Sequence, residues 1–307
     1  MSQKHIPVML NEVLQSLAPA DGKVYVDATF GNGGYTKAIL DSANCKVIAI
    51  DRDPNVKERA KEIKAAYGER FEFCAGCFGD INSLVKQPVD GIVFDIGVSS
   101  MQLDQAERGF SYAKEANLDM RMSCDGVSAY DLINTASEKE LADIIYQYGE
   151  ERKSRQIASK IVNERKAAPI KTTKQLAEII YQVIHKKPGQ PDPATRTFQA
   201  LRIAVNDELG ELERGLCNGL SILKSGGKMV VVTFHSLEDR IVKKFFSEKS
   251  GKKVHVSRYA PEIPENQNCE LTNPSKAILP TEEEIAANSR AHSAKLRYAT
   301  KTSETNR

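Results

Sequence analysis

The sequence lacks any apolar run that approaches the roughly 20 residues needed to cross a bilayer. Its N-terminus also lacks the long apolar segment and the small-residue cleavage site of a secretory signal. It contains no internal repeat and no low-complexity tract. These absences argue against a membrane or secreted protein and predict a cytoplasmic location.

Cysteine is scarce, with six residues in the chain. Cys74 and Cys77 have the spacing of a redox dithiol or of half a zinc site, but a zinc site needs more ligands. No second such pair and no histidine pair is present. The simpler interpretation is that these are two small residues at the end of a strand, so we expect free thiols and no metal.

The length of 307 residues favours two domains, and 41% hydrophobic residues suffice for a buried core. The net charge of +2 is unevenly distributed: residues 151–200 carry a net +7, whereas the rest of the chain carries −5. A positive region of this kind suits a module that binds a polyanion such as RNA. A solvated helical surface has the same composition, so charge alone leaves the choice open.

Nearly continuous apolar strands alternate with helical segments in the first hundred residues. The predicted strands are residues 24–27, 46–51, 71–73 and 91–95. This pattern is typical of a doubly wound, Rossmann-like α/β unit, in which helices cover both faces of a parallel sheet.

The pattern changes after about residue 105, where helices are predicted at 137–148, at 151–165 and from Thr173. A loop rich in proline follows at 186–193, and a long helix is predicted from Thr195 through Leu212. A buried strand returns at 226–234. We therefore expect a helical domain at 106–200, inserted into an α/β domain that comprises 1–105 and 201–307.

A glycine turn with Gly31, Gly33 and Gly34 follows the first predicted strand. Thr36 stands where a dinucleotide-binding fingerprint needs a third small residue. Asp27, four positions before Gly31, is poorly suited to a pyrophosphate but suits a cationic ammonium group. S-adenosylmethionine carries an ammonium and a sulfonium, so the turn resembles the first motif of the α/β-fold methyltransferases.

Two further acids end predicted strands. Asp51 lies twenty positions after Gly31, where an acid accepts hydrogen bonds from both ribose hydroxyls of a nucleoside. Asp95 ends the fourth strand, at the edge of the sheet where ligands bind in such folds. Phe78 follows the third strand. It could pack on an adenine ring or in the core, and the sequence leaves both roles open.

Seven further segments are distinctive in sequence and order: FDIGVSSMQLD (94–104), RGFS (108–111), LDMRM (118–122), YGEER (148–152), PATRTFQALRI (193–203), FHSLEDR (234–240) and SAKLR (293–297). With the glycine turn they resemble the bacterial 16S ribosomal RNA cytosine-N4 methyltransferases, the RsmH or MraW family. The resemblance covers nearly the whole chain.

The resemblance implies S-adenosyl-L-methionine as methyl donor and, as acceptor, a cytidine of 16S rRNA in the decoding centre, at the ribosomal P site. It also implies the small ribosomal subunit as the partner, while the oligomeric state stays open and a homodimer is compatible. Tyr35 stands where the family usually has histidine, which puts a side-chain role there in doubt. By position, the cofactor contacts fall on Gly33, Gly34, Tyr35, Asp51, Phe78, Asp95 and Gln102.

The cytosine amine attacks the methyl group directly, so no cysteine nucleophile is expected. Asp95 is the candidate for positioning or accepting the amine proton, with service to the cofactor alone as an equal alternative. His235 is expected to line the substrate side. A metal site formed by His235, Glu238 and Asp239 is less favoured than a helix cap centred on Ser236.

Arg196, Gln199 and Arg202 form a polar stripe with Asn206 at helical spacing. The stripe could face RNA phosphates or the cofactor cleft, or it could be a solvated or domain-bridging face. Two other functional classes are a nicotinamide oxidoreductase, which the missing third glycine opposes, and a non-catalytic RNA-binding protein with S-adenosylmethionine as ligand.

Overall fold

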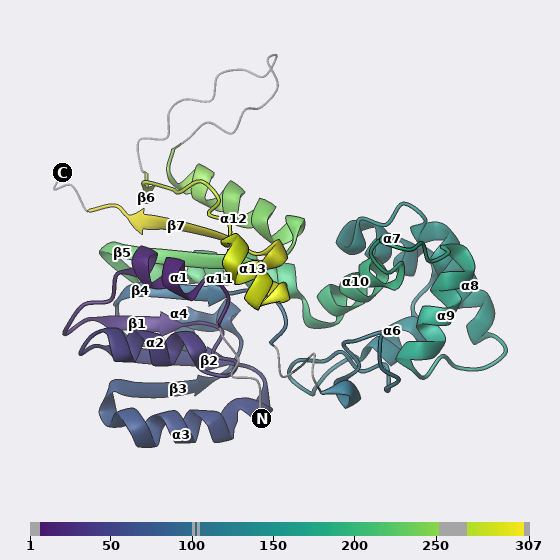
Figure 1. The fold of residues 1–307 in the computed structure, drawn as a ribbon, viewed down its shortest axis with the longest axis horizontal. Coiled ribbons are helices and arrows are strands. Elements are labelled where there is room, and N and C mark those ends of the chain that lie inside the picture. Colours follow the sequence, from purple (N-terminus) through teal and green to yellow (C-terminus); the bar gives the residue numbers. More distant parts are fainter. Residues whose placement is uncertain (1–6, 100–101, 103–104, 252–268, 304–307) are drawn as a thin grey trace, which may run out of the picture. The chain divides into compact units, whose positions relative to one another are not determined.

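The computed structural model describes residues 7–99, 102, 105–251 and 269–303 (Figure 1). The chain divides into an α/β unit, Met1–Gly97 with Leu209–Arg307, and a helical unit, Val98–Glu208. In the described residues, no helix combines the length and apolar composition needed to cross a membrane.

Seven strands of the described residues form one sheet in the order β3-β2-β1-β4-β5-β7-β6. β1 pairs in parallel with β2 on one side and β4 on the other, so the strand order reverses at β1 and β4. β7 is antiparallel to β5 and β6. The strands are β1 Val24–Asp27, β2 Lys46–Asp51, β3 Phe71–Ala75, β4 Val89–Asp95, β5 Leu223–Thr233, β6 Leu271–Thr272 and β7 Lys295–Lys301.

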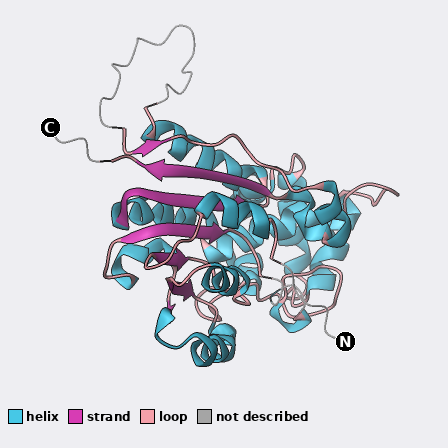
Figure 2. Cartoon of the chain, turned by 60° about the vertical axis from the view of Figure 1, so that its left-hand side comes forward, coloured by secondary structure: helices cyan, strands magenta, loops and turns pink. Residues whose placement is uncertain are grey.

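Helices lie on both sides of this sheet, as Figure 2 shows. The helices of the unit are α1 Leu10–Leu17, α2 Gly34–Ser42, α3 Lys57–Tyr67, α4 Ile81–Leu84, α11 Glu208–Ile222, α12 Ser236–Lys249 and α13 Glu282–Ala287. Alternate strand residues such as Val26 and Ile92 pack with apolar residues of α4, α11 and α12 in one core. α1, α2 and α3 pack against β4, β2 and β3. The prediction of a doubly wound α/β fold is confirmed.

The helical unit contains α6 Ala129–Thr135, α7 Glu138–Gly149, α8 Ser154–Arg165, α9 Thr173–Val183 and α10 Ala194–Asn206. It has a core of its own, which includes Leu141, Ile161, Ile180 and Phe198. Side-chain caps begin several helices, because Ser, Thr and Asp oxygens satisfy the free amides of a first turn. Ser128 and Thr172 form capping boxes with the third residues of α6 and α9.

The prediction of one long helix from Thr195 through Leu212 is wrong, because the helix is interrupted at Asp207. This residue has φ of 48°, in the left-handed region, and separates α10 from α11. The side chain of Asn206 accepts a hydrogen bond from the Met122 amide at 2.8 Å and donates one to the Met120 carbonyl at 2.7 Å. These bonds attach the end of α10 to the helical unit. That unit spans residues 98–208, whereas the expected domain spans 106–200.

Candidate functional site

The glycine turn joins β1 to α2 at the edge where the parallel strands end. Gly31 and Gly33 have φ of 49° and 72°, which side chains other than glycine rarely adopt. A Cβ on Gly33 would lie 2.4 Å from Ile63 Cδ1, and one on Gly34 would lie 2.3 Å from Pro7 Cγ. Backbone conformation and close packing therefore require glycine at the predicted positions 33 and 34.

Asp27 is completely buried beneath this turn. Its Oδ2 accepts hydrogen bonds from the amide and hydroxyl of Thr36 at 3.1 and 2.7 Å, and its Oδ1 accepts one from the Thr29 amide at 3.3 Å. Burial raises the pKa of Asp27 to about 6, against the lowering effect of these bonds. The carboxylate therefore fastens the end of β1 to the first turn of α2, a role that the sequence analysis did not assign to it.

Asp51, at the end of β2, supports the turn from the other side. Its Oδ2 accepts a hydrogen bond from the Gly31 amide at 2.7 Å, and its Oδ1 accepts one from the Asp53 amide at 2.8 Å. Burial raises the pKa of Asp51. Each carboxylate oxygen accepts more than one hydrogen bond, so the half-buried Asp51 still has capacity for two ribose hydroxyls.

Asp95 ends β4, beside β1 at the point where the strand order reverses. Its amide donates to Thr29 Oγ1 at 2.7 Å, which holds the two strand ends together. Within the described part of the chain, its buried Oδ1 has no hydrogen-bond partner. Burial, together with the negative charges of Asp27 and Glu238, raises the pKa of Asp95 to about 8. A buried acceptor in a field of carboxylates suits a ligand that brings positive charge and a donor.

Three other predicted cofactor residues have different surroundings. The buried Tyr35 hydroxyl donates to the Val8 carbonyl, so this side chain holds the N-terminal segment. Phe78 lies edge-on to Phe94, with ring centroids 5.8 Å apart, and is half-buried against the core. Gln102 belongs to the helical unit, where its Oε1 accepts the Ser99 amide at 3.0 Å.

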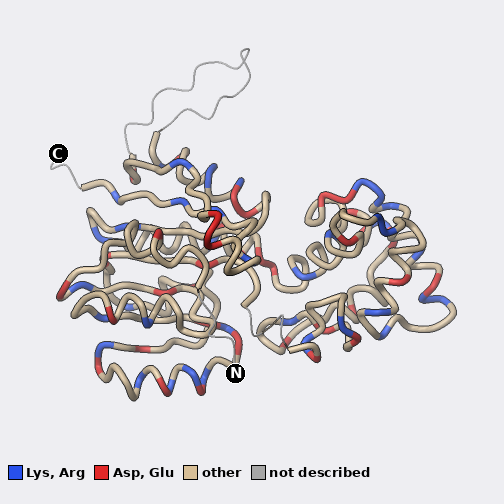
Figure 3. The backbone as a smooth tube through the Cα atoms, viewed as in Figure 1, with Lys and Arg blue, Asp and Glu red and all other residues tan. Residues whose placement is uncertain are grey.

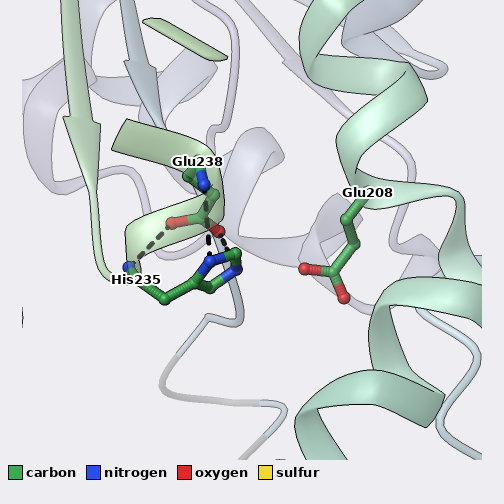
Figure 4. A group of neighbouring side chains, drawn as sticks. All are labelled: Glu208, His235 and Glu238. Carbon is green, nitrogen blue, oxygen red and sulfur yellow. Dashed lines mark hydrogen bonds and ion pairs between the residues drawn. The ribbon is translucent and has the colours of Figure 1, made fainter. Parts of the chain in front are cut away.

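His235 follows β5 and caps α12, so the cap is His235 and not Ser236 (Figure 4). Glu238 is completely buried, and its Oε2 accepts hydrogen bonds from the Phe234 and His235 amides at 2.8 and 3.2 Å. Glu238 Oε1 lies 2.9 Å from His235 Nε2. Figure 4 also draws Glu208, the last residue of the helical unit. The sequence analysis considered Glu238 only as a ligand in a less favoured metal site, although its spacing from His235 is that of a capping box.

The predicted polar stripe of α10 has partners within the helical unit. Arg196 is exposed and donates to the Glu150 carbonyl at 3.3 Å. Gln199 donates to the Tyr148 carbonyl at 3.1 Å. The guanidinium of Arg202 binds both carboxylate oxygens of Glu208, at 2.8 and 2.9 Å. These bonds fasten α10 to the end of α7 and to the residues that follow its own end.

A doubly wound sheet with a glycine turn after β1 and acids at the ends of β1, β2 and β4 is the arrangement of an α/β methyltransferase. The model of the MraW methylase family matches residues 2–302. The chain belongs to this family, so the resemblance predicted from the motifs is confirmed, and the chain is a methyltransferase. Membership sets aside the oxidoreductase alternative.

Relatives in this family are similar over almost their whole length. A "Ribosomal RNA small subunit methyltransferase H" of Rickettsia massiliae is 56% identical over 303 residues, which cover 97% of this chain and 98% of the relative. That of Rickettsia bellii is 55% identical over 306 residues, covering 98% of this chain and all of the relative. A solved rRNA methylase of Streptococcus thermophilus has 10% identity and a TM-score of 0.40, over 98% of this chain and 100% of that chain.

Proposed function

We propose that this protein methylates 16S rRNA of the small ribosomal subunit, using S-adenosylmethionine as methyl donor. The ribosomal RNA substrate is supported by relatives that carry that name at 56% identity over 97% of the chain. The finer assignment is the exocyclic N4 amine of a cytidine in the decoding centre, at the P site, and it is supported by the motif resemblance. The observation that carries the chemistry is the buried Asp95 Oδ1 without a partner among the described residues.

The residues at the sheet edge fit this donor. When bound, S-adenosylmethionine supplies an activated methyl group on a positively charged sulfur. Asp51 would accept the ribose hydroxyls through the lone pairs that the Gly31 and Asp53 amides leave available. Burial and the charges of Asp27 and Glu238 raise the pKa of Asp95, so its charged form would be stabilised by a bound cation. This favours the sulfonium of the donor over the demethylated product, which has no positive sulfur.

The acceptor amine is a poor nucleophile, because its lone pair is delocalised into the cytosine ring. Oδ1 of Asp95 is an acceptor for an N4–H hydrogen bond, which places electron density on the nitrogen and provides a destination for the proton. His235 follows β5, and in the parallel pairing of the two strands Asp95 is opposite Val232. His235 is thus close in the sheet to the end of β4, on the side where we place the RNA base. Reaching a base within folded RNA requires some extrusion from its stack.

The test is transfer of labelled methyl from S-adenosylmethionine to naked 16S rRNA, to small ribosomal subunits and to DNA. Nucleoside analysis of the product should show N4-methylcytidine at one position of the decoding centre. Asp95→Asn should remove most of the rate. Because it keeps the shape of the side chain and an acceptor but carries no charge, a lost kcat at saturating donor would assign Asp95 to the acceptor amine in addition to any effect on donor binding. A label in DNA alone, or on another base, would contradict the proposal.

A further inference from the structure

The basic residues of the helical unit, blue in Figure 3, differ in their ion pairs. Several form ion pairs: Lys160 with Glu164 at 2.6 Å, Lys186 with Asp192 at 2.8 Å and Arg202 with Glu208 at 2.8 Å. In contrast, Arg152, Lys153, Arg155 and Lys187 are all exposed, and no ion pair joins them to a described carboxylate. The excess positive charge of residues 151–200 therefore lies on exposed basic residues that have no ion pair to a described carboxylate.

These four residues lie at the same end of the helical unit. Lys153 Nζ donates to the carbonyl of Val183, the last residue of α9, at 3.1 Å, so the start of α8 lies beside the end of α9. Lys187 follows in the next loop, which the hydrogen bond from the Tyr181 hydroxyl to Asp192 fastens to α9 at 3.0 Å. We call Arg152, Lys153, Arg155 and Lys187 the basic end of the helical unit.

Helix stability does not explain three of these positions. α8 begins without a side-chain cap and without an acidic residue in its first turn, whereas Arg152, Lys153 and Arg155 surround that start. Positive side chains near a helix N-terminus oppose the helix dipole. The buried carboxylate of Glu151 already accepts a hydrogen bond from the Lys153 amide at 2.8 Å, so a phosphate at this end would be held by the exposed basic side chains.

We infer that the basic end, and not the polar stripe of α10, binds backbone phosphates of the RNA substrate. The inference rests on the proposed function for the identity of that RNA. Gln199, Arg202 and Asn206 of α10 have partners within the unit, so an RNA contact there would have to break existing bonds. Lys153 has one such bond, to the Val183 carbonyl, whereas Arg152, Arg155 and Lys187 can take phosphates without losing an internal ion pair.

The opposite end of the same helices provides a matched control. Lys139, Lys166 and Lys171 are also exposed lysines of the helical unit. Arg165, at the end of α8, donates to the carbonyls of Ile133 and Ala136, so this end lies beside α6 and away from the start of α8. The variants R152Q/R155Q/K187Q and K139Q/K166Q/K171Q therefore each remove the same charge from one end.

The affinity of each full-length variant for a naked 16S rRNA transcript is measured between 50 and 300 mM salt. Each phosphate contact to a single strand contributes a slope of about −0.7 in log K against log salt, or about fivefold at 0.1 M. The basic-end variant should thus bind about 100-fold more weakly, with a slope lower by about 2. The control variant should bind within about threefold of wild type. Both should bind S-adenosylmethionine as wild type does, which shows that they are folded.

Equal losses in the two variants, or no loss in the first, would overturn the inference. Unchanged binding to naked rRNA with a higher KM on small subunits would also overturn it, because the surface would then contact ribosomal protein. If wild type transfers no methyl to rRNA, the proposed function fails, but the binding comparison still decides whether this end holds RNA.

Discussion

Asp95 should make donor binding depend on pH. Its folded-state pKa of about 8 means that the carboxyl holds its proton at neutral pH in the absence of a ligand. A sulfonium cation favours the charged form and lowers that pKa, so binding of S-adenosylmethionine should release a proton. The demethylated product has no positive sulfur and should release less.

The magnitude follows from the pKa. At pH 7 a group with a pKa of about 8 is about 90% protonated, so about 0.9 proton should leave for each donor bound. If only the charged form binds, the donor Kd should fall about 50-fold from pH 6 to pH 8 and change by less than about twofold above pH 9. In Asp95→Asn both effects should disappear.

Calorimetry in buffers of different ionisation enthalpy measures the proton release directly. Stability gives an independent check. A carboxyl whose folded pKa is raised destabilises the fold as pH rises from about 4 through about 8, so Asp95→Asn should raise the Tm of the ligand-free protein at pH 9 more than at pH 5. Equal proton release by wild type and Asp95→Asn, or a donor Kd that is flat between pH 6 and pH 8 in wild type, would refute this account of the site.

Three other substitutions test the turn and its surroundings. Asp51→Ala should weaken donor binding by about 100-fold or more in a titration, because two hydrogen bonds to a charged acceptor are lost, and unchanged affinity would remove the ribose assignment. Tyr35→Phe should lower the stability by about 1 kcal/mol in denaturant unfolding and leave the donor Kd within about twofold, whereas a large loss of affinity would give this side chain a cofactor role. Gly33→Ala should lower the stability by about 1–3 kcal/mol, because the new Cβ meets Ile63 in a left-handed backbone, and a variant as stable as wild type would contradict the packing described here.

Local pattern was enough to predict the α/β unit. Residues 24–27 and 46–51 were predicted as strands with the same bounds that β1 and β2 have, since a buried parallel strand is apolar without interruption. Asp51 and Asp95 were also predicted at strand ends, because each follows directly from an apolar run. Such features depend on neighbours within a few residues, which a sequence displays.

Contacts between residues distant in sequence determine the helix break and the hydrogen bonds of the strand-end acids. Apolar spacing continues through position 207, so the sequence does not display the break between α10 and α11. At that break the side chain of Asn206 binds Met120 and Met122, more than eighty positions away. Likewise, the strand-end acids Asp27 and Asp95 look alike in sequence, but Thr29 and Thr36 occupy both oxygens of one, while Oδ1 of the other has no partner among the described residues. Whether a carboxylate oxygen has a hydrogen-bond partner depends on which groups the fold brings within hydrogen-bond distance, and only the tertiary structure determines that.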